Sequence, residues 1–225
     1  MLWQWVNSGT QVFILDLDGT LMPSAEIDNE CYWQAVYECY DLPHRLPDLH
    51  DFQNVTDSSI LHEWCVRQLG RSPLDDEVNV IKLRFVELLE IAHAQQSDHF
   101  TPLPGVVQWL EAATQQAHVF TGIATGGWAL SARLKLKLSG LERFDLPLAS
   151  SDDALTRTGI MQTALKRTVE IQGSDPPLIS YVGDGAWDLQ ASRQLGWNFI
   201  AIASGDRARQ FRLAGVDQIR TDFRK

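Results

Sequence analysis

The chain of 225 residues has few cysteines, and their spacing does not suit cross-links. The three are Cys31, Cys39 and Cys65. An odd number without paired short spacings argues against a disulfide framework and against a structural zinc site. We therefore expect reduced, buried thiols in a cytoplasmic protein.

Positive charge is also in short supply. Lys and Arg number 19 against 29 Asp and Glu, which gives a formal net charge of −10. An acidic protein repels a phosphate backbone, so we expect no nucleic-acid partner. A phosphorylated small molecule would be repelled as well, unless a metal ion or basic side chains supply positive charge inside its binding site.

Long apolar segments are missing too. No run approaches the roughly 20 apolar residues that a membrane-spanning helix needs. Residues 1–9 carry no basic residue ahead of a short apolar stretch, so they do not have the pattern of a secretory signal. We expect no association with a membrane. The composition, 44% hydrophobic and 21% charged, is that of a folded globular protein.

Five short apolar runs predict buried strands. They are 12–15, 118–124, 145–149, 178–182 and 198–202. From the second run onward, the intervals between them are long enough for a helix. Strands that alternate with helices indicate an α/β domain with a mainly parallel sheet.

The long gap between the first two runs has a helical pattern instead. Two sets of apolar residues within it share a helix face at spacings of three and four. The longer set is Val78, Ile81, Phe85, Leu88 and Ala92, and the shorter set is Ile27, Cys31 and Ala35. Proline-containing segments at 22–24 and 101–105 mark both ends. We predict a helical domain over 22–100, inserted into a core domain formed by 1–21 and 101–225.

One stretch, 133–138, alternates leucine with Arg or Lys, as an amphipathic strand would. Four leucines in and around it also fit one helix face, and two glycines at 126 and 127 suit a helix entry. These leucines are Leu130, Leu134, Leu138 and Leu141. We predict a helix.

The first chemical motif, Asp16-Leu17-Asp18-Gly19-Thr20, directly follows the first apolar run. In an open α/β sheet, ligands bind beyond the carboxyl ends of the strands. Two carboxylates two residues apart can hold a hard cation there, while Gly19 permits a sharp turn. Alone, such a pair in an acidic chain is more often a solvated turn. A calcium-binding EF-hand loop is excluded because Ile27 would occupy its bidentate position.

Three further motifs follow later apolar runs. Thr125 and Gly126 come after the second run and could cradle a phosphate, although such turns are often rich in Gly and Thr for steric reasons alone. Arg157 lies in the predicted loop after the third run, where an isolated Arg is normally solvated. Asp184 and Asp188 follow the fourth run, and a helix there would place them on one face. Acidic residues at a helix N-terminus are also common without any ligand.

Taken in this order, each at a strand end, the four motifs resemble the haloacid dehalogenase superfamily of phosphohydrolases. The resemblance covers about residues 12–202. It implies a doubly wound, mainly parallel, Rossmann-like sheet with a helical cap inserted after the first motif. Residues 22–100 match this cap, as in the phosphoglycolate-phosphatase-like branch.

The resemblance also implies roles for the acidic residues. Asp16 is similar to the nucleophile that forms an aspartyl-phosphate, and Asp18 to the general acid and base. Asp16, the backbone carbonyl of Asp18, and Asp184 would bind Mg²⁺, while Asp188 would orient these ligands.

The phosphate-binding residues depart from the family pattern. Thr125 and the amides beside it, including that of Gly126, would hold the transferring phosphoryl group together with Arg157. The family more often has Lys in place of Arg157, and Lys166 is a rival, although it lies inside a predicted helix. The family also usually has Asn where this chain has Gly126.

Asp18 favours a phosphate ester or anhydride over a haloacid, because a halide leaving group needs no proton. The expected partner is a small phosphorylated metabolite. A sugar-phosphate mutase and a non-catalytic, metal-binding regulatory module are alternatives. The natural substrate and the oligomeric state stay open.

Two groups of residues in the inserted domain can each be interpreted as functional or as structural. Thr56 and Asp57 match the cap loop that faces the core, yet either residue would serve as an ordinary helix N-cap. A group of aromatic residues could form a docking surface, although aromatics at helical spacing are more often core. This group is Trp33, Tyr37, Tyr40 and Trp64.

Overall fold

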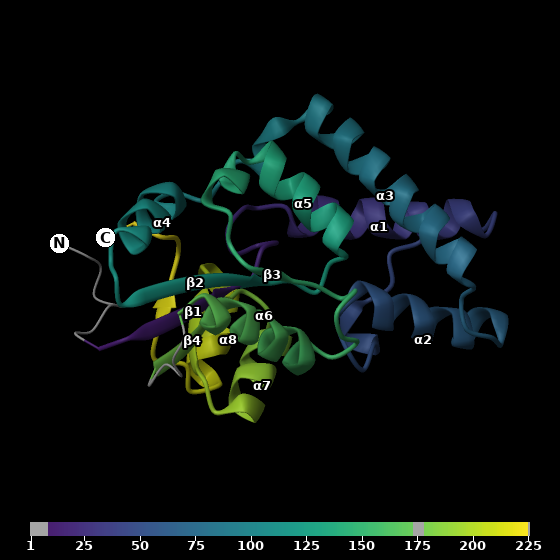
Figure 1. Cartoon of the computed structure of the whole chain (residues 1–225). Coiled ribbons are helices and arrows are strands. Elements are labelled where there is room, and N and C mark those ends of the chain that lie inside the picture. The colour runs from purple at the N-terminus through teal and green to yellow at the C-terminus, as the bar shows by residue number, and fades with distance from the viewer. Residues whose placement is uncertain (1–8, 173–177, 225) are drawn as a thin grey trace.

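The centre of the computed structural model, which describes residues 9–172 and 178–224, is a six-stranded parallel sheet (Figure 1). Its strands are β1 (Gln11–Leu15), β2 (Val119–Ala124), β3 (Leu148–Ala149), β4 (Leu178–Gly183), β5 (Asn198–Ile202) and β6 (Ile219–Arg220). The order is β3-β2-β1-β4-β5-β6, and neighbouring strands pair in parallel. The predicted parallel sheet is confirmed, and β6 is added to it.

The chain winds outward in both directions from the middle of this sheet. After β1 it continues to β2 and β3 on one side, and β4 lies on the other side of β1 and leads to β5 and β6. The order therefore reverses between β1 and β4, which makes the carboxyl ends of these two strands the expected ligand-binding edge.

Strand β1 is buried on both faces, which explains its continuous apolar sequence. Val12 and Ile14 pack in one cluster with residues of α6 (Arg157–Gln172). Phe13 lies on the opposite face, where its ring centroid is 5.3 Å from that of Trp109 in α4 (Val106–Thr114). Helices α7 (Ala186–Leu195) and α8 (Gly205–Leu213) cover the β4–β6 side of the sheet.

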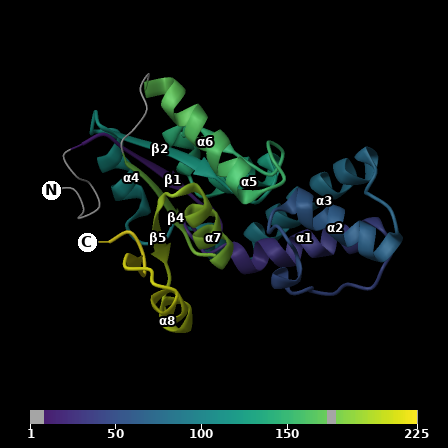
Figure 2. The same ribbon diagram turned by 90° about the horizontal axis from the view of Figure 1, so that it is seen from below.

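The predicted inserted helices gather at one end of the molecule, beyond the strands (Figure 2). They are α1 (Ala25–Cys39), α2 (Asp57–Leu69) and α3 (Asp75–Gln95), with two short 3₁₀ helices, η1 (Leu49–Asp51) and η2 (Ser97–Phe100). The structure thus has the helical cap that the fold class requires. The boundaries 22 and 100 stay a prediction.

The cap packs around the apolar faces that the sequence predicts. Ile81 and Phe85 of α3 are fully buried, while Val78 is only partly buried. Three of the four aromatic residues considered above as a docking surface, Trp33, Tyr37 and Trp64, are buried in the cap core. The hypothesis that these aromatic residues form a docking surface is therefore wrong, because their rings pack against one another.

The ambiguous stretch forms helix α5 (Ala129–Leu138), which lies beside α3 (Figure 1). The predicted leucine face is correct in part: Leu134 and Leu138 pack against the core, and Leu141, just beyond the helix, is buried. Leu130 is 44% exposed, and the buried residues of the helix are Ser131, Ala132 and Lys135. The most deeply buried positions of the helix are thus polar or small, because Lys135 has acidic partners there.

Two element boundaries also differ from the prediction. Strand β3 begins at Leu148 rather than at 145, because Asp145 takes a left-handed conformation (φ 47°) at the end of η3 (Leu141–Phe144). Arg157 is the first residue of α6 rather than part of the preceding loop. Among the described residues, no helix is both long and apolar enough to cross a membrane.

Candidate active site

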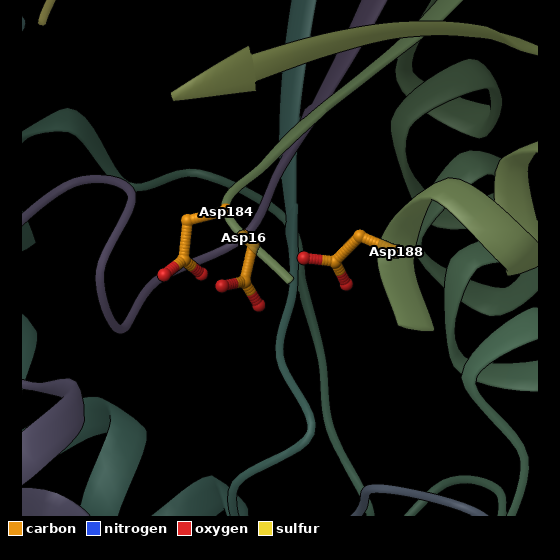
Figure 3. Close-up of side chains that lie close together, drawn as sticks. All are labelled: Asp16, Asp184 and Asp188. Carbon is orange, nitrogen blue, oxygen red and sulfur yellow. The ribbon is translucent and has the colours of Figure 1, made fainter. Parts of the chain in front are cut away.

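Three carboxylates meet at the edge where the strand order reverses. Asp16 follows β1, Asp184 follows the neighbouring strand β4, and Asp188 lies in the first turn of α7. All three are buried, and an oxygen from each lies within 4.8 Å of the others. Figure 3 shows Asp188 directed from its helix toward the carboxylates of Asp16 and Asp184. The structure therefore brings together residues that the sequence predicts from two separate motifs.

Burial and mutual repulsion disfavour the charged forms of this cluster. Burial and the charge of Asp188 raise the pKa of Asp16 well above its usual range, although Arg157 opposes this. The same two causes raise the pKa of Asp184 to about 7, against the effect of Arg207. Burial also raises the pKa of Asp188. A divalent cation would relieve this repulsion, and carboxylate oxygens are the ligands that Mg²⁺ prefers, so the donor set fits the predicted metal.

The turn after β1 requires a glycine. Gly19 has φ of +78°, and a Cβ at this position would overlap the carboxylate of Asp184. The first motif therefore approaches the fourth through a residue without a side chain.

Arg157 supplies positive charge beside the acidic cluster. Its Nη1 lies 3.3 Å from Asp16 Oδ1, and its Nε lies 3.1 Å from Asp188 Oδ1. Burial alone would lower the pKa of Arg157, but the carboxylates of Asp188 and Asp16 outweigh it, so the guanidinium stays charged. Lys166 is 76% exposed and pairs with Glu170 on the protein surface. The structure thus places Arg157 in the site and Lys166 outside it.

Arg157 also explains the glycine in the second motif. A Cβ on Gly126 would lie 2.9 Å from Arg157 Nη1 and 2.8 Å from the carbonyl oxygen of Val55 in the cap. Any side chain at this position would compete with the guanidinium for space. The preceding residue, Thr125, is buried, and its Oγ1 accepts a hydrogen bond from the amide of Gly127 at 3.1 Å.

The carboxylate of Asp18 is held at both oxygens. Ser24 Oγ donates a hydrogen bond to Oδ1, and Lys135 Nζ donates one to Oδ2, each at 2.5 Å. Lys135 also donates to Asp28 Oδ1 at 2.6 Å.

Lys135 is fully buried beside the carboxylates of Asp18 and Asp28. Burial alone would lower the pKa of Lys135, but Asp18 and Asp28 raise it above its ordinary value. The single ammonium group of Lys135 can compensate the charge of only one of these two carboxylates. Burial and the charge of Asp18 therefore raise the pKa of Asp28 to about 7 despite Lys135.

Lys135 and Arg207 are two site residues that the sequence analysis missed. Arg207 on α8 pairs with Asp184, and its side chain is 56% exposed. The sequence gives no signal for either residue, because each meets its acidic partners only through the tertiary fold.

Core and cap residues together line one cavity of about 670 Å³ between the sheet edge and the cap. The core contributes Asp16, Asp18, Thr125, Arg157 and Asp184, and the cap contributes Glu26, Asp28, Tyr32, His50 and Asp57. The predicted catalytic, phosphate-binding and cap residues therefore share one space.

Thr56 and Asp57 line this cavity and also attach the cap to the core. The hydroxyl of Thr56 caps α2 by accepting from the amide of Ser59, and it donates to the carbonyl of Leu155 at 2.8 Å. Asp57 Oδ2 accepts from the amide of Trp128 at 2.8 Å. The helix-cap reading thus holds for Thr56, and contact with a substrate stays a prediction for both.

Comparison with known proteins gives one family and several related structures. The family described as haloacid dehalogenase-like hydrolase matches residues 13–202. A comparison with curated protein sequences gives no match. CbbY from Rhodobacter sphaeroides, solved in complex with phosphate, is 19% identical to this chain, with a TM-score of 0.68 and 95% of each chain covered.

Two further solved structures share the fold. A predicted phosphoglycolate phosphatase from Haemophilus somnus 129pt is 18% identical, with a TM-score of 0.57 and 96% of each chain covered. A β-phosphoglucomutase candidate from Bacteroides vulgatus is 16% identical, with a TM-score of 0.65, and the match covers 96% of this chain and 85% of the other.

The structural matches establish the fold, and the sequence match establishes the family. The matched residues, 13–202, begin within β1 and end with β5, so they contain all four motifs and the whole cap. The resemblance inferred from the strand-end motifs is confirmed: this chain belongs to the haloacid dehalogenase-like hydrolase family.

Proposed function

We propose that this protein is a Mg²⁺-dependent phosphatase that hydrolyses a small phosphate monoester through an aspartyl-phosphate on Asp16. The observation that carries the proposal is the pairing of the buried Asp16 carboxylate with the buried Arg157 guanidinium at the cavity. A carboxylate can attack a phosphate dianion only where positive charge offsets their repulsion. The acidic net charge of the chain makes this local charge more necessary.

In the first step, a carboxylate oxygen of Asp16 attacks phosphorus, and the bond between phosphorus and the ester oxygen breaks. Arg157 lies beside Asp16 and would balance the charge of the phosphoryl group during transfer. Thr125 lines the same space, and its hydroxyl would orient the phosphoryl group. Asp18 donates a proton to the departing alcohol oxygen.

In the second step, Asp18 takes a proton from a water molecule, which attacks the phosphorus of the aspartyl-phosphate. The bond between phosphorus and the Asp16 oxygen breaks, inorganic phosphate is released and the Asp16 carboxylate is restored. The cap forms one wall of the cavity, so its closure over the sheet edge would exclude bulk water during transfer.

Mg²⁺ would be held by Asp16, Asp184 and the backbone carbonyl of Asp18, with Asp188 orienting these ligands. When bound, it supplies positive charge that polarises the phosphoryl oxygens. Arg157 forms an ion pair with Asp188 through Nε and with Asp16 through Nη1, so one side chain contacts both carboxylates.

A sugar-phosphate mutase is a second candidate, because the β-phosphoglucomutase candidate shares the fold over 96% of this chain. Such an enzyme returns the phosphoryl group to a sugar instead of to water. Net release of inorganic phosphate therefore separates the two candidates. A non-catalytic metal-binding module would show neither reaction.

The first test measures phosphate release from a panel of small phosphate esters, with Mg²⁺ and with EDTA. We expect release only with Mg²⁺, and Asp16→Asn to lower kcat/KM by at least about 10³-fold, because an amide cannot attack phosphorus. Asp217→Asn makes the same change at an exposed aspartate and should retain full activity.

Two results would contradict the proposal. Equal turnover by the wild type and Asp16→Asn would exclude Asp16 as the nucleophile. A wild type that is inert toward the whole panel with Mg²⁺ would favour the mutase or the binding module. Conversion of a sugar phosphate into its isomer without phosphate release would then identify the mutase.

A further inference from the structure

Lys135 is a fully buried charge for which the proposed reaction gives no role. A buried ammonium is costly unless it is paired and hydrogen-bonded. Here it pairs with two carboxylates, Asp18 at 2.5 Å and Asp28 at 2.6 Å. The three residues come from separate parts of the chain: the loop after β1, the first turn of α1, and α5.

The hydrogen bond from Lys135 holds the carboxyl of Asp18, which needs a defined position to transfer a proton. Ser24 Oγ donates to Oδ1 and Lys135 Nζ donates to Oδ2, so the carboxyl cannot rotate without losing a hydrogen bond. Each carboxylate oxygen has a second lone-pair site, so these contacts leave Asp18 able to meet a further partner. Asp18 lines the cavity that also holds Asp16 and Arg157.

The hydrogen bond to Asp28 in turn holds the ammonium group of Lys135. Asp28 lies on α1, the helix with which the chain enters the cap, and it lines the same cavity. Helix α5 lies beside α3 of the cap rather than against the sheet (Figure 1). Lys135 therefore joins the turn that carries Asp18 to the first helix of the cap.

We propose that Lys135 is a positioning residue: its ammonium group, itself held by Asp28, keeps the Asp18 carboxyl where it exchanges protons with the leaving-group oxygen. This inference rests on the proposed function, in which Asp18 is the general acid. It differs from a purely structural role, in which Lys135 only compensates buried negative charge. A structural role would affect every substrate alike, whereas a positioning role depends on how much the leaving group needs a proton.

The test compares two esters in Lys135→Met. The p-nitrophenolate of p-nitrophenyl phosphate is stable enough to leave without a proton, whereas an alkoxide is not. The second ester is the alkyl phosphate that the wild type hydrolyses best. We measure kcat/KM, which reports the steps up to departure of the leaving group.

We expect kcat/KM of Lys135→Met to fall on the order of 10²-fold for the alkyl ester and by less than about threefold for p-nitrophenyl phosphate. A burst of p-nitrophenolate should precede slower turnover, because Asp18 also serves the second step. Lys137→Met removes an exposed lysine from the same helix and should change neither ester.

A second variant separates positioning from folding. Lys135→Met leaves Asp28 buried without its ammonium, so its melting temperature should fall. The double variant Lys135→Met with Asp28→Asn removes that unpaired charge. It should recover the melting temperature but not the hydrolysis of the alkyl ester, and it replaces the single variant if that one fails to fold.

The outcomes for the two proposals differ. Equal losses for both esters, or recovery of alkyl-ester hydrolysis in the double variant, would overturn the role of Lys135 and leave the phosphatase intact. A wild type that hydrolyses neither ester with Mg²⁺ would overturn the proposed function, and the role of Lys135 with it.

Discussion

At the scale of single residues, Gly126 and Arg157 form a steric pair. The guanidinium occupies the space where a side chain at 126 would project, and the carbonyl of Val55 closes the other side. Arg157 and Gly126, the two positions at which the sequence analysis expects departures from the family pattern, therefore lie in contact, and a side chain at 126 would compete with the guanidinium for the same space.

We expect Gly126→Asn to lower kcat/KM by about tenfold or more, because a displaced charge loses much of its transition-state stabilisation. The new side chain would push Arg157 away from Asp16. Adding Arg157→Lys should recover part of the loss, since a lysine leaves more room. The measurement is kcat/KM for the best phosphate ester of the panel.

Gly70→Asn is the matched control for this substitution. Gly70 ends α2 in a left-handed conformation, which Asn tolerates, and no atom lies within 4 Å of its added Cβ. We expect full activity in this variant. Full activity in Gly126→Asn as well would contradict the steric pairing.

At the scale of elements, the start of α2 holds the cap against the core. The hydroxyl of Thr56 accepts from the amide of Ser59 and donates to the carbonyl of Leu155, which lies in the loop before α6. The side chain of Asp57 accepts from the amide of Trp128, just before α5. One helix N-terminus thus contacts the loops that follow β2 and β3.

We expect Thr56→Val to lower the free energy of unfolding by about 1–2 kcal/mol, because it removes an N-cap and leaves the Leu155 carbonyl without this donor. Thr56→Ser keeps the hydroxyl and should lose little stability. Urea denaturation measures both variants. A large loss of activity in Thr56→Val at unchanged stability would show instead that the hydroxyl contacts the substrate.

At the scale of the whole molecule, the fold buries a set of acidic groups that oppose one another. Asp16, Asp184 and Asp188 meet at one edge of the sheet, and the pKa of each carboxyl is raised. Raised carboxyl pKa values mean that the folded protein binds protons that the unfolded chain has already released. Between the ordinary carboxyl pKa of 3.8 and about 7, stability therefore falls as pH rises.

We expect the free energy of unfolding in EDTA to decrease from pH 5 to pH 7, with a slope of up to about 1.4 kcal/mol per pH unit for each such proton. Mg²⁺ binds the ionised carboxylates of the folded state and should reduce or reverse this decrease. Urea denaturation at several pH values, with Mg²⁺ and with EDTA, measures the effect.

Asp184→Asn is the control for the pH dependence, because it removes the carboxyl whose pKa is raised to about 7. In EDTA, the free energy of unfolding of this variant should decrease less steeply with pH than that of the wild type. A wild type whose stability in EDTA rises with pH through this window would contradict the raised pKa values, and so would an unchanged slope in Asp184→Asn.

Local patterns in the sequence predicted the parallel sheet, the inserted helices and the family. Buried strands appear as continuous apolar runs, helices as residues at spacings of three and four, and the acidic motifs stand directly after the strands that place them. These signals are local. The resemblance to the family predicted that Asp16 and Asp184 share a metal site, and the pairing of β1 with β4 brings the two residues to the same edge.

Contacts between distant parts of the chain bury Lys135 of α5, bring Arg157 into the site and hold Asp18. Lys135 lies 117 residues from Asp18 and 107 from Asp28, and Arg157 lies 141 residues from Asp16. A lysine between leucines has the pattern of a solvated helix position. It is buried because the fold brings two carboxylates to it, and no local pattern records a partner so distant in sequence.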